Sequence, residues 1–120
     1  MTIGEVSKKF GMTADTIRYY ERIGLLPYIP RKKNGIRDFD EEACKWVSFV
    51  KCMRGAGVQI EALIEYVTLM KNDDDPKRRR EILVQQRVKL IDKLEQLRST
   101  IERLNFKIDH YDEMLLKSKL

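Results

Sequence analysis

The stretch TIRYYERIGLLP, residues 16–27, indicates how the N-terminal part of the chain folds. A helix is expected over its first half, because Thr13 can accept a hydrogen bond from the backbone at the helix start. Ile17 and Tyr20 then supply an inward face, and Gly24 ends the helix. The two leucines and the proline that follow predict an extended segment.

A shorter helix precedes this stretch. Thr2 followed by Glu5 is the pattern of a capping box, in which each side chain bonds the other residue's backbone N–H. Apolar residues at helical spacing follow, and Gly11 ends the segment. Two short helices joined by a tight turn predict a helix-turn-helix.

A small wing is expected after Pro27. Asn34-Gly35 is the strongest two-residue hairpin signal, and it lies between a basic arm and the arm Ile-Arg-Asp-Phe. Beyond the wing, Asp40 opens a third helix that runs to Gly55, and an apolar stripe over residues 60–70 predicts a fourth. The expected fold class is mainly α, a winged helix-turn-helix head of four short helices and a β-hairpin.

The polar run KNDDDP, residues 71–76, divides the chain into a head, residues 1–71, and a charged helix, residues 72–120. The helix covers about 40 residues, or about 60 Å at 1.5 Å per residue. Its apolar residues follow a heptad seam, whose one charged member is Arg87, and such a seam predicts a coiled-coil dimer. The heptads leave parallel and antiparallel pairing open. The predicted dimerisation residues are Leu83, Leu90, Leu94, Leu97, Ile101, Leu104, Ile108, Tyr111 and Leu115.

Composition narrows the class of protein. The chain of 120 residues is 36% charged and 42% hydrophobic, with a net charge of +5 and a mean hydropathy of -0.49. It has neither a membrane-span candidate nor the apolar core of a secretory signal, so we expect a cytoplasmic protein without a membrane partner. The basic balance permits a polyanion as partner. Two cysteines without a secretion signal argue against a disulfide framework.

The order of these elements, with TIRYYERIGLLP before a basic Asn-Gly wing and a terminal coiled coil, resembles the MerR family of transcriptional regulators. The resemblance covers nearly the whole chain. It implies a homodimer whose antiparallel coiled coil sets two winged heads on a pseudo-palindromic promoter site in double-stranded DNA. It also implies that the protein distorts this DNA so that RNA polymerase can engage both promoter elements.

DNA contacts are expected from three places: the exposed side of the second helix, the wing, and the end of the third helix. An arginine or hydroxyl on the second helix can reach base edges in a major groove, and the cationic wing suits phosphates. The predicted DNA-binding residues are Thr13, Ala14, Thr16, Arg18, Tyr19, Tyr20, Arg31, Lys32, Lys33, Asn34, Arg37, Lys51 and Arg54.

No cofactor or metal is expected. Where metal-sensing relatives carry cysteines, this chain has residues 76–78, Pro-Lys-Arg, and residues 117–119, Lys-Ser-Lys, which are poor soft ligands. The single histidine, His110, lies at an outer heptad position, so we expect it to be a solvated surface residue. The chain ends soon after the seam, so we expect no separate effector domain.

Cys52, in the segment FVKCMRGAG, resembles the single cysteine of the aldehyde- and electrophile-responsive branch of the family, the AdhR/NmlR-like branch. It is a candidate sensor thiol. Two readings stay open, a sensor or a small hydrophobe that fills the core. The end of a helix is an unfavourable place for a thiolate. Cys44 lies about 12 Å away along the same helix, too far for a disulfide, which needs Cα atoms within about 7 Å.

Three alternatives compete with a thiol-gated regulator. A thiol enzyme that used Cys52 with His110 fails because one residue lies in the head and the other on the outside of the coiled coil. We therefore expect no enzyme. A protein that acts only through its coiled coil would give the basic wing no function, which counts against this alternative. The third alternative is a regulator of the same family that senses no thiol modification.

Overall fold

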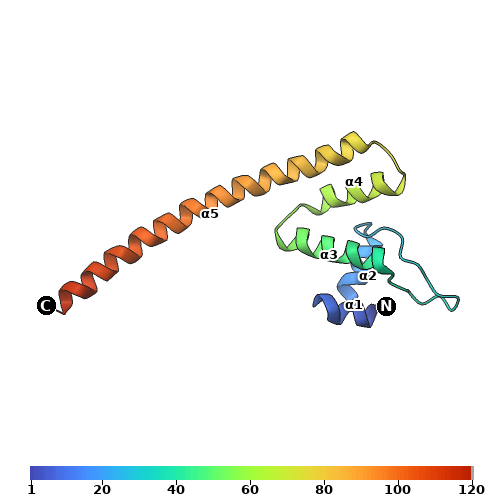
Figure 1. The fold of residues 1–120 in the computed structure, drawn as a ribbon, viewed down its shortest axis with the longest axis horizontal. Coiled ribbons are helices and arrows are strands. Elements are labelled where there is room, and N and C mark those ends of the chain that lie inside the picture. The colour runs from blue at the N-terminus through green and yellow to red at the C-terminus, as the bar shows by residue number, and fades with distance from the viewer. Residues whose placement is uncertain (120) are drawn as a thin grey trace. The chain divides into compact units, whose positions relative to one another are not determined.

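Five helices make up the structure, a computed structural model that describes residues 1–119 (Figure 1). In chain order they are α1 Ile3–Phe10, α2 Ala14–Arg22, α3 Glu41–Gly55, α4 Ile60–Lys71 and α5 Pro76–Ser118. The predicted mainly α class is confirmed, and every expected helix is present. Contacts divide the chain into a first unit, Met1–Gln86, and a second unit that begins at Arg87 within α5.

The first two helices begin and end where the sequence indicates. Thr2 Oγ1 accepts a hydrogen bond from the N–H of Glu5 at 3.1 Å, and a Glu5 carboxylate oxygen accepts one from the N–H of Thr2 at 3.1 Å. The capping box is therefore complete. Gly11 ends α1 with a φ of 64°, in the left-handed region that glycine adopts without strain. Thr13 Oγ1 accepts from the N–H of Thr16 at 3.1 Å and caps α2.

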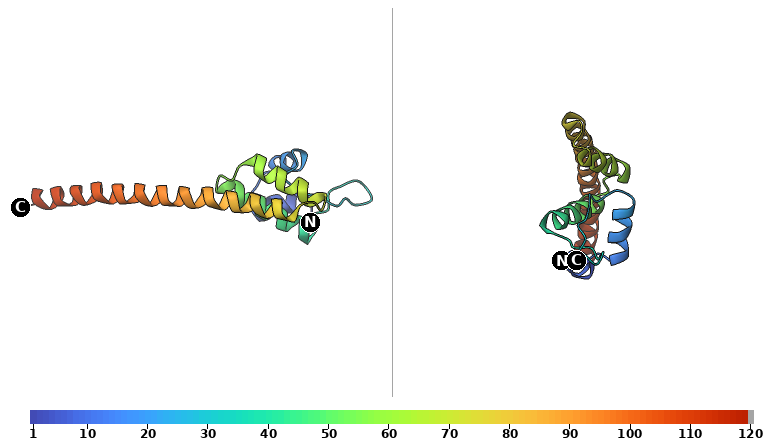
Figure 2. Two further views of the ribbon diagram at one scale, coloured as in Figure 1. Left: turned by 90° about the horizontal axis from the view of Figure 1, so that it is seen from above. Right: turned by 90° about the vertical axis from the view of Figure 1, so that its right-hand side faces the viewer.

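The core of the first unit lies where α1 packs against α2 and α3 (Figures 1 and 2). Phe39, which joins the wing to α3, is the largest of the fully buried side chains. Ile17 from α2 and Val6 from α1 are buried with it, and so are Leu25 and Leu26, which follow α2. Burying such side chains is the main favourable term in holding a small unit together.

The wing differs from the predicted β-hairpin. Instead of two strands, the segment contains one isolated antiparallel bridge, between Arg31 and Arg37, and no strand forms among residues 1–119. The N–H of Gly35 bonds the carbonyl of Lys32 at 2.9 Å, and Gly35 has a φ of 84°. The tip is thus a three-residue loop closed by a left-handed glycine, so the expected two-residue Asn-Gly turn was wrong.

Two residues explain why the ladder stops. Pro30 lacks an N–H, so its position can only accept, and it does so from the N–H of Asp38 at 2.8 Å. At the other end the N–H of Ile36 donates to the side chain of Asn34 at 3.1 Å and is lost to the ladder. The side chain that signals the turn therefore competes with strand pairing.

The start of α5 belongs to the first unit. Asp75 caps the helix, since its carboxylate accepts from the N–H of Arg78 at 3.1 Å. The guanidinium of Arg78 also binds both oxygens of Glu65 on α4, at 3.0 and 3.1 Å. Ile82 is buried. Because of these contacts the first unit extends to Gln86. The sequence suggests an earlier boundary for the head, at residue 71.

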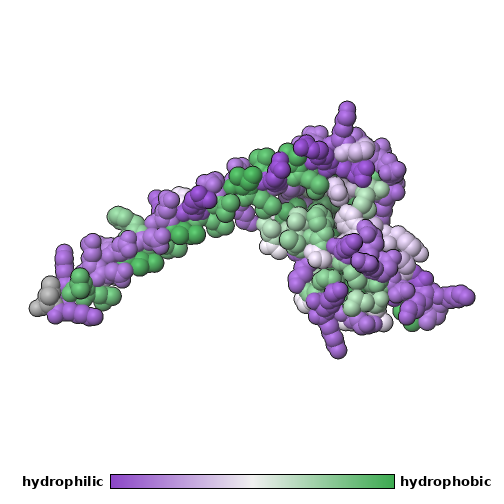
Figure 3. All heavy atoms as spheres, viewed as in Figure 1, coloured by the Kyte–Doolittle hydropathy of each residue, from purple (hydrophilic) through white to green (hydrophobic). Residues whose placement is uncertain are grey.

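The second unit is a continuous exposed helix. Apolar residues gather along one side of α5 (Figure 3), and the seam residues from Leu94 to Leu115 are 54–61% exposed. Soluble monomers seldom leave a contiguous apolar surface of this extent uncovered. The heptad pattern therefore corresponds to an apolar surface of α5 that the fold of one chain leaves exposed to solvent.

Candidate nucleic-acid interface

Five of the predicted DNA-binding residues line one open hollow of about 470 Å³, formed by the turn between α1 and α2, by α2 itself and by the end of α3. Those five are Thr13, Thr16, Tyr20, Lys51 and Arg54. The sequence places them up to 41 positions apart, and the helix packing brings them together. The hollow combines hydroxyls with two cations, which is suitable chemistry for a phosphate.

The two cations of the hollow are fixed by backbone carbonyls. The Lys51 ammonium donates to the carbonyl of Phe10, at the end of α1. Arg54 donates from Nη1 to the carbonyl of Val58 at 2.6 Å. Lys51 thereby bonds a carbonyl at the C-terminal end of α1, and Arg54 bonds one in the segment between α3 and α4. Both side chains carry further N–H groups. The positive charge therefore has a defined position before any ligand arrives.

The exposed face of α2 carries Arg18 and Tyr19. Arg18 is 48% exposed and forms an ion pair with Asp15, one turn earlier, at 3.0 Å. Tyr19 is 42% exposed, and the guanidinium of Arg22 lies 5.3 Å from the centre of its ring. Ala14, the first residue of α2, is half-buried and small enough for close approach by another molecule. A surface pair such as Arg18 with Asp15 is weak, so the arginine can be recruited by an anion.

The wing residues fall into two groups. Lys32, Lys33 and Asn34 are exposed at the tip, as the sequence predicts. Arg31 is also exposed, and its Nη1 donates to the carbonyl of Gly35 at 3.0 Å. Arg37, also predicted as a DNA contact, is half-buried and bound to an acid on α2.

That acid is Glu21, a residue that the sequence did not single out. Glu21 Oε1 accepts from Arg37 Nε at 2.9 Å and lies 2.8 Å from Arg37 Nη2 and 3.7 Å from Arg31 Nη2. It joins both ends of the wing's single bridge to α2. No local pattern marks this role, because the two arginines follow it by 10 and 16 positions.

The two cysteines are free thiols in different environments. Cys44 is buried, with its sulfur 3.9 Å from the carbonyl of Phe39 and 3.8 Å from Met1 Sδ. Cys52 is exposed on the chain. Cys44 is thus the cysteine that fills the core. Cys52 lies in sequence between Lys51 and Arg54, the two cations of the hollow.

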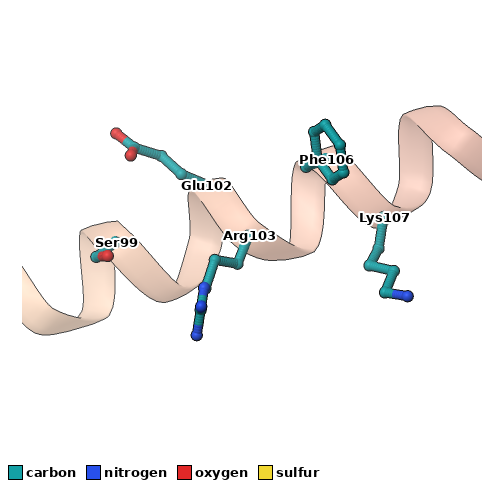
Figure 4. A pocket seen from close by; sticks show the side chains of 5 residues that line it. All are labelled: Ser99, Glu102, Arg103, Phe106 and Lys107. Carbon is teal, nitrogen blue, oxygen red and sulfur yellow. The ribbon is translucent and has the colours of Figure 1, made fainter.

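Other hollows and groups are poor candidates for this role. Ser99, Glu102, Arg103, Phe106 and Lys107 line a hollow on α5 (Figure 4), but all five side chains project from one helix, which cannot enclose a ligand. Within the described residues no three His, Cys, Asp or Glu side chains gather as a metal site would require. No described helix is long and apolar enough to cross a membrane.

Comparisons with known proteins agree with this geometry. Residues 1–69 match the family described as MerR HTH family regulatory protein. AdhR, an HTH-type transcriptional regulator of Bacillus subtilis, is 55% identical over 93 residues, which are 77% of this chain and 66% of AdhR, slightly under two thirds of its length.

Two solved structures are similar. A MerR family transcriptional regulator from Listeria monocytogenes superposes with a TM-score of 0.92 at 43% identity, covering 99% of this chain and 91% of that one. HiNmlR, a MerR family regulator lacking the sensor domain and solved bound to promoter DNA, gives 0.83 at 23% identity, covering 93% and 90%. At that identity HiNmlR supports the fold alone. These relatives are regulators, so the prediction that the chain is not an enzyme is confirmed. The chain belongs to the MerR family of helix-turn-helix transcriptional regulators.

Proposed function

We propose that the protein is a homodimer that binds a pseudo-palindromic promoter site in double-stranded DNA and distorts it to control transcription. The observation that carries the proposal is the hollow beside α2, where Lys51 and Arg54 meet the hydroxyls of the helix-turn-helix. In a helix-turn-helix the second helix enters the major groove. Arg18 on the exposed face of α2 would then reach base edges, and the hydroxyl of Tyr19 would reach the DNA backbone, with Ala14 at the helix start allowing close approach.

The remaining cations position the head. Lys51 and Arg54 would hold one phosphate at the hollow, and Arg31, Lys32, Lys33 and Asn34 would hold others at the wing. Phosphate contacts set register and orientation without reading sequence. We assign Arg37 a different part from the other wing residues: bound to Glu21, it fixes the wing against α2.

Two heads require two chains. The exposed seam of α5 supports a coiled-coil homodimer over residues 72–120, with residues 1–71 as the DNA-binding part. Two heads with two wings would clamp the DNA on both sides of a distortion, and deforming DNA generates specificity at bases that no side chain touches. RNA polymerase is the further partner that the family resemblance implies, and we propose that the protein acts in the cytoplasm.

We also propose that Cys52 gates this activity. Its thiol is exposed, and its neighbours in sequence, Lys51 and Arg54, line the hollow. Addition of the thiol to an aldehyde forms a bond between sulfur and the carbonyl carbon, and the thiol proton passes to the carbonyl oxygen. Lys51 and Arg54 lie one and two positions from Cys52 and so point to other sides of α3, and a group added to the thiol would act on them only by displacing the end of that helix.

The test is footprinting of the wild-type protein on its own upstream region and neighbouring promoters, with and without a thiol-reactive aldehyde. We expect a palindromic footprint that weakens steeply with salt, because several phosphates are neutralised by each head. We expect the aldehyde to change DNA distortion in the wild type and in Cys44→Ala, and to have no effect in Cys52→Ser.

Each alternative has its own signature. A footprint unaffected by aldehyde in all three proteins would retain the regulator and discard the thiol gate. Absence of a footprint at low salt on every promoter tested would instead favour the coiled-coil interaction protein. A thiol reaction rate for Cys52 no faster than in the denatured chain would also count against the gate.

A further inference from the structure

The connection between α4 and α5 is a turn of four residues, 72–75, and hydrogen bonds fix its first half (Figure 1). The N–H of Asp73 donates to the carbonyl of Met70 at 3.0 Å. The N–H of Asp74 donates to the carbonyl of Leu69 at 2.9 Å. This pair of bonds is the Schellman arrangement of a helix end, in which the residue after the cap has a left-handed backbone. Asp73 has that conformation, with a φ of 48°.

The second half of the turn is fixed by the start of α5. Asp75 also has a left-handed backbone, with a φ of 40°. Its carboxylate accepts from the N–H of Arg78 at 3.1 Å, and its carbonyl accepts from the N–H of Arg79 at 3.0 Å. Left-handed residues other than glycine are uncommon, although aspartate is enriched among them. The turn therefore has little freedom, because each helix end is closed by bonds of its own.

An ion pair joins the two helices across this turn. Arg78 on α5 binds both carboxylate oxygens of Glu65 on α4, through Nη2 at 3.0 Å and Nε at 3.1 Å. A guanidinium that meets a carboxylate through two nitrogens fixes an orientation as well as a distance. The side chains of Arg78 and Glu65 are 36% and 45% exposed, so their pair contributes little to stability. Its main effect is on the angle between α4 and the start of α5.

We propose that Glu65 and Arg78 are positioning residues that fix the start of α5 against α4 and thereby select the spacing of half-sites that the dimer accepts on DNA. The inference rests on the proposed homodimer and DNA binding, and it adds a determinant of operator geometry that contacts no base. α5 is one continuous helix from Pro76, so a change of angle at its first turn alters the direction of the whole helix. On DNA about 10 base pairs make one turn, so a displaced head meets a differently rotated half-site.

The test uses a series of operators, derived from the footprinted site, in which the two half-sites are moved apart or together by one base pair at a time. The full chain is titrated with each operator, and fluorescence anisotropy gives the affinity. The quantity compared is the ratio of the affinity at the best spacing to the affinity one base pair away. A general change in the charge of the protein affects every operator alike and cancels in this ratio.

We expect the ratio to fall about threefold or more in Glu65→Gln and in Arg78→Gln, because the angle between the helices is no longer fixed. The double variant should show the same ratio as each single one, since either change alone breaks the pair. Glu65→Arg combined with Arg78→Glu reverses both charges and should regain the spacing preference that Glu65→Arg alone loses. A merely structural role would instead lower the affinity at every spacing by the same factor.

Two exposed neighbours supply the matched controls, Glu61→Gln on α4 and Arg80→Gln on α5. Both should leave the ratio at its wild-type value. A wild-type ratio in Glu65→Gln and Arg78→Gln, or an equal loss of affinity at every spacing, would overturn the positioning role. So would a wild-type protein that binds all spacings equally. A wild-type protein that binds no paired half-sites would overturn the proposed DNA binding itself, so the two failures are distinguishable.

Discussion

Glu21 on α2 and Arg37 on the wing form a half-buried ion pair, with Glu21 Oε1 2.8 Å from Arg37 Nη2 and accepting from Arg37 Nε at 2.9 Å. An arginine that meets a carboxylate through two of its nitrogens has a defined orientation as well as a favourable charge. The pair substitutes for the missing strand ladder: it holds the wing against the helix that we assign to the major groove.

Glu21→Gln tests whether this pair positions the wing. The substitution removes a negative charge, so general attraction to DNA would increase and affinity would rise. If Glu21 positions the wing, operator affinity instead falls by about three- to tenfold, because a mobile wing must be ordered on binding. Fluorescence anisotropy with operator DNA measures the change, with Glu61→Gln, an exposed acid on α4, as the charge control. An affinity increase equal to that of the control would contradict the positioning role.

Arg18 and Lys33 should behave differently on DNA. Arg18→Ala is expected to cost about 1–3 kcal/mol on the operator and to relax specificity, because it removes a base contact. Lys33→Ala should weaken all DNA sequences about equally and reduce the salt slope by about 1, as the loss of one phosphate contact does. Binding titrations over a salt series, on operator and scrambled DNA, separate these outcomes. Equal losses on both DNAs would remove Arg18 from base reading.

Leu97→Lys should break the dimer and with it two-headed binding. The side chain lies on the exposed seam, and an ammonium in a paired apolar layer would lose its water. Sedimentation should give the mass of one chain, and the footprint should be lost or shrink to a half-site. Ser99→Lys adds the same charge nearby and off the seam, and should stay dimeric. A dimeric Leu97→Lys protein would count against the seam.

Phe39→Ala should destabilise the first unit by about 3–5 kcal/mol, the usual cost of deleting a buried aromatic ring. Phe39 is 1% exposed, between the wing and α3. Phe106→Ala deletes the same ring where it is 78% exposed, and should change the free energy of unfolding by less than about 0.5 kcal/mol. Urea unfolding followed by Trp46 fluorescence reports both. Similar midpoints would mean that Phe39 is not part of the core.

Acid should weaken the start of α1. The N–H of Thr2 donates to Glu5 and holds the pKa of that carboxyl below its usual value of 4.5. A lowered folded-state pKa means that the stabilisation is present above about pH 4.5 and is lost as the pH falls through the folded value. Thermal unfolding between pH 7 and pH 3 should therefore decline less in Glu5→Gln than in the wild type. Glu113→Gln, on the outer face of α5, should decline as the wild type does.

The helices could be predicted because their signals are local. In four of the helices the cap accepts a hydrogen bond from the backbone N–H three residues later, and these capping residues are Thr2, Thr13, Asp40 and Asp75. Gly11 ends α1 through its own backbone conformation. Apolar spacing located the seam of α5 for the same reason, since heptads are a property of one helix. The order of these local elements is in turn what the family resemblance rests on.

The contacts that shape the candidate site are not local, and this is why they were missed. Glu21 meets Arg37 only because the wing folds back on α2. Asn34 lies in a turn, as predicted. Its side chain accepts a hydrogen bond from the N–H of Ile36, however, so this N–H is not available for the strand pairing expected beside the turn. Lys51 reaches Phe10 across 41 positions. Pairings of this kind depend on how the helices and the wing pack together. The spacing of apolar residues along the chain carries no information about that packing.

The uncovered seam of α5 has a consequence for gene dosage. If only the paired form has two heads, the amount of active regulator rises with the square of the free chain concentration while that concentration is below the dimer dissociation constant. A twofold change in synthesis or degradation would then produce about a fourfold change in the concentration of the dimer, and in promoter occupancy while most sites are free. Unpaired chains would also expose these leucines to chaperones and proteases, so unpaired chains should be degraded faster than paired ones.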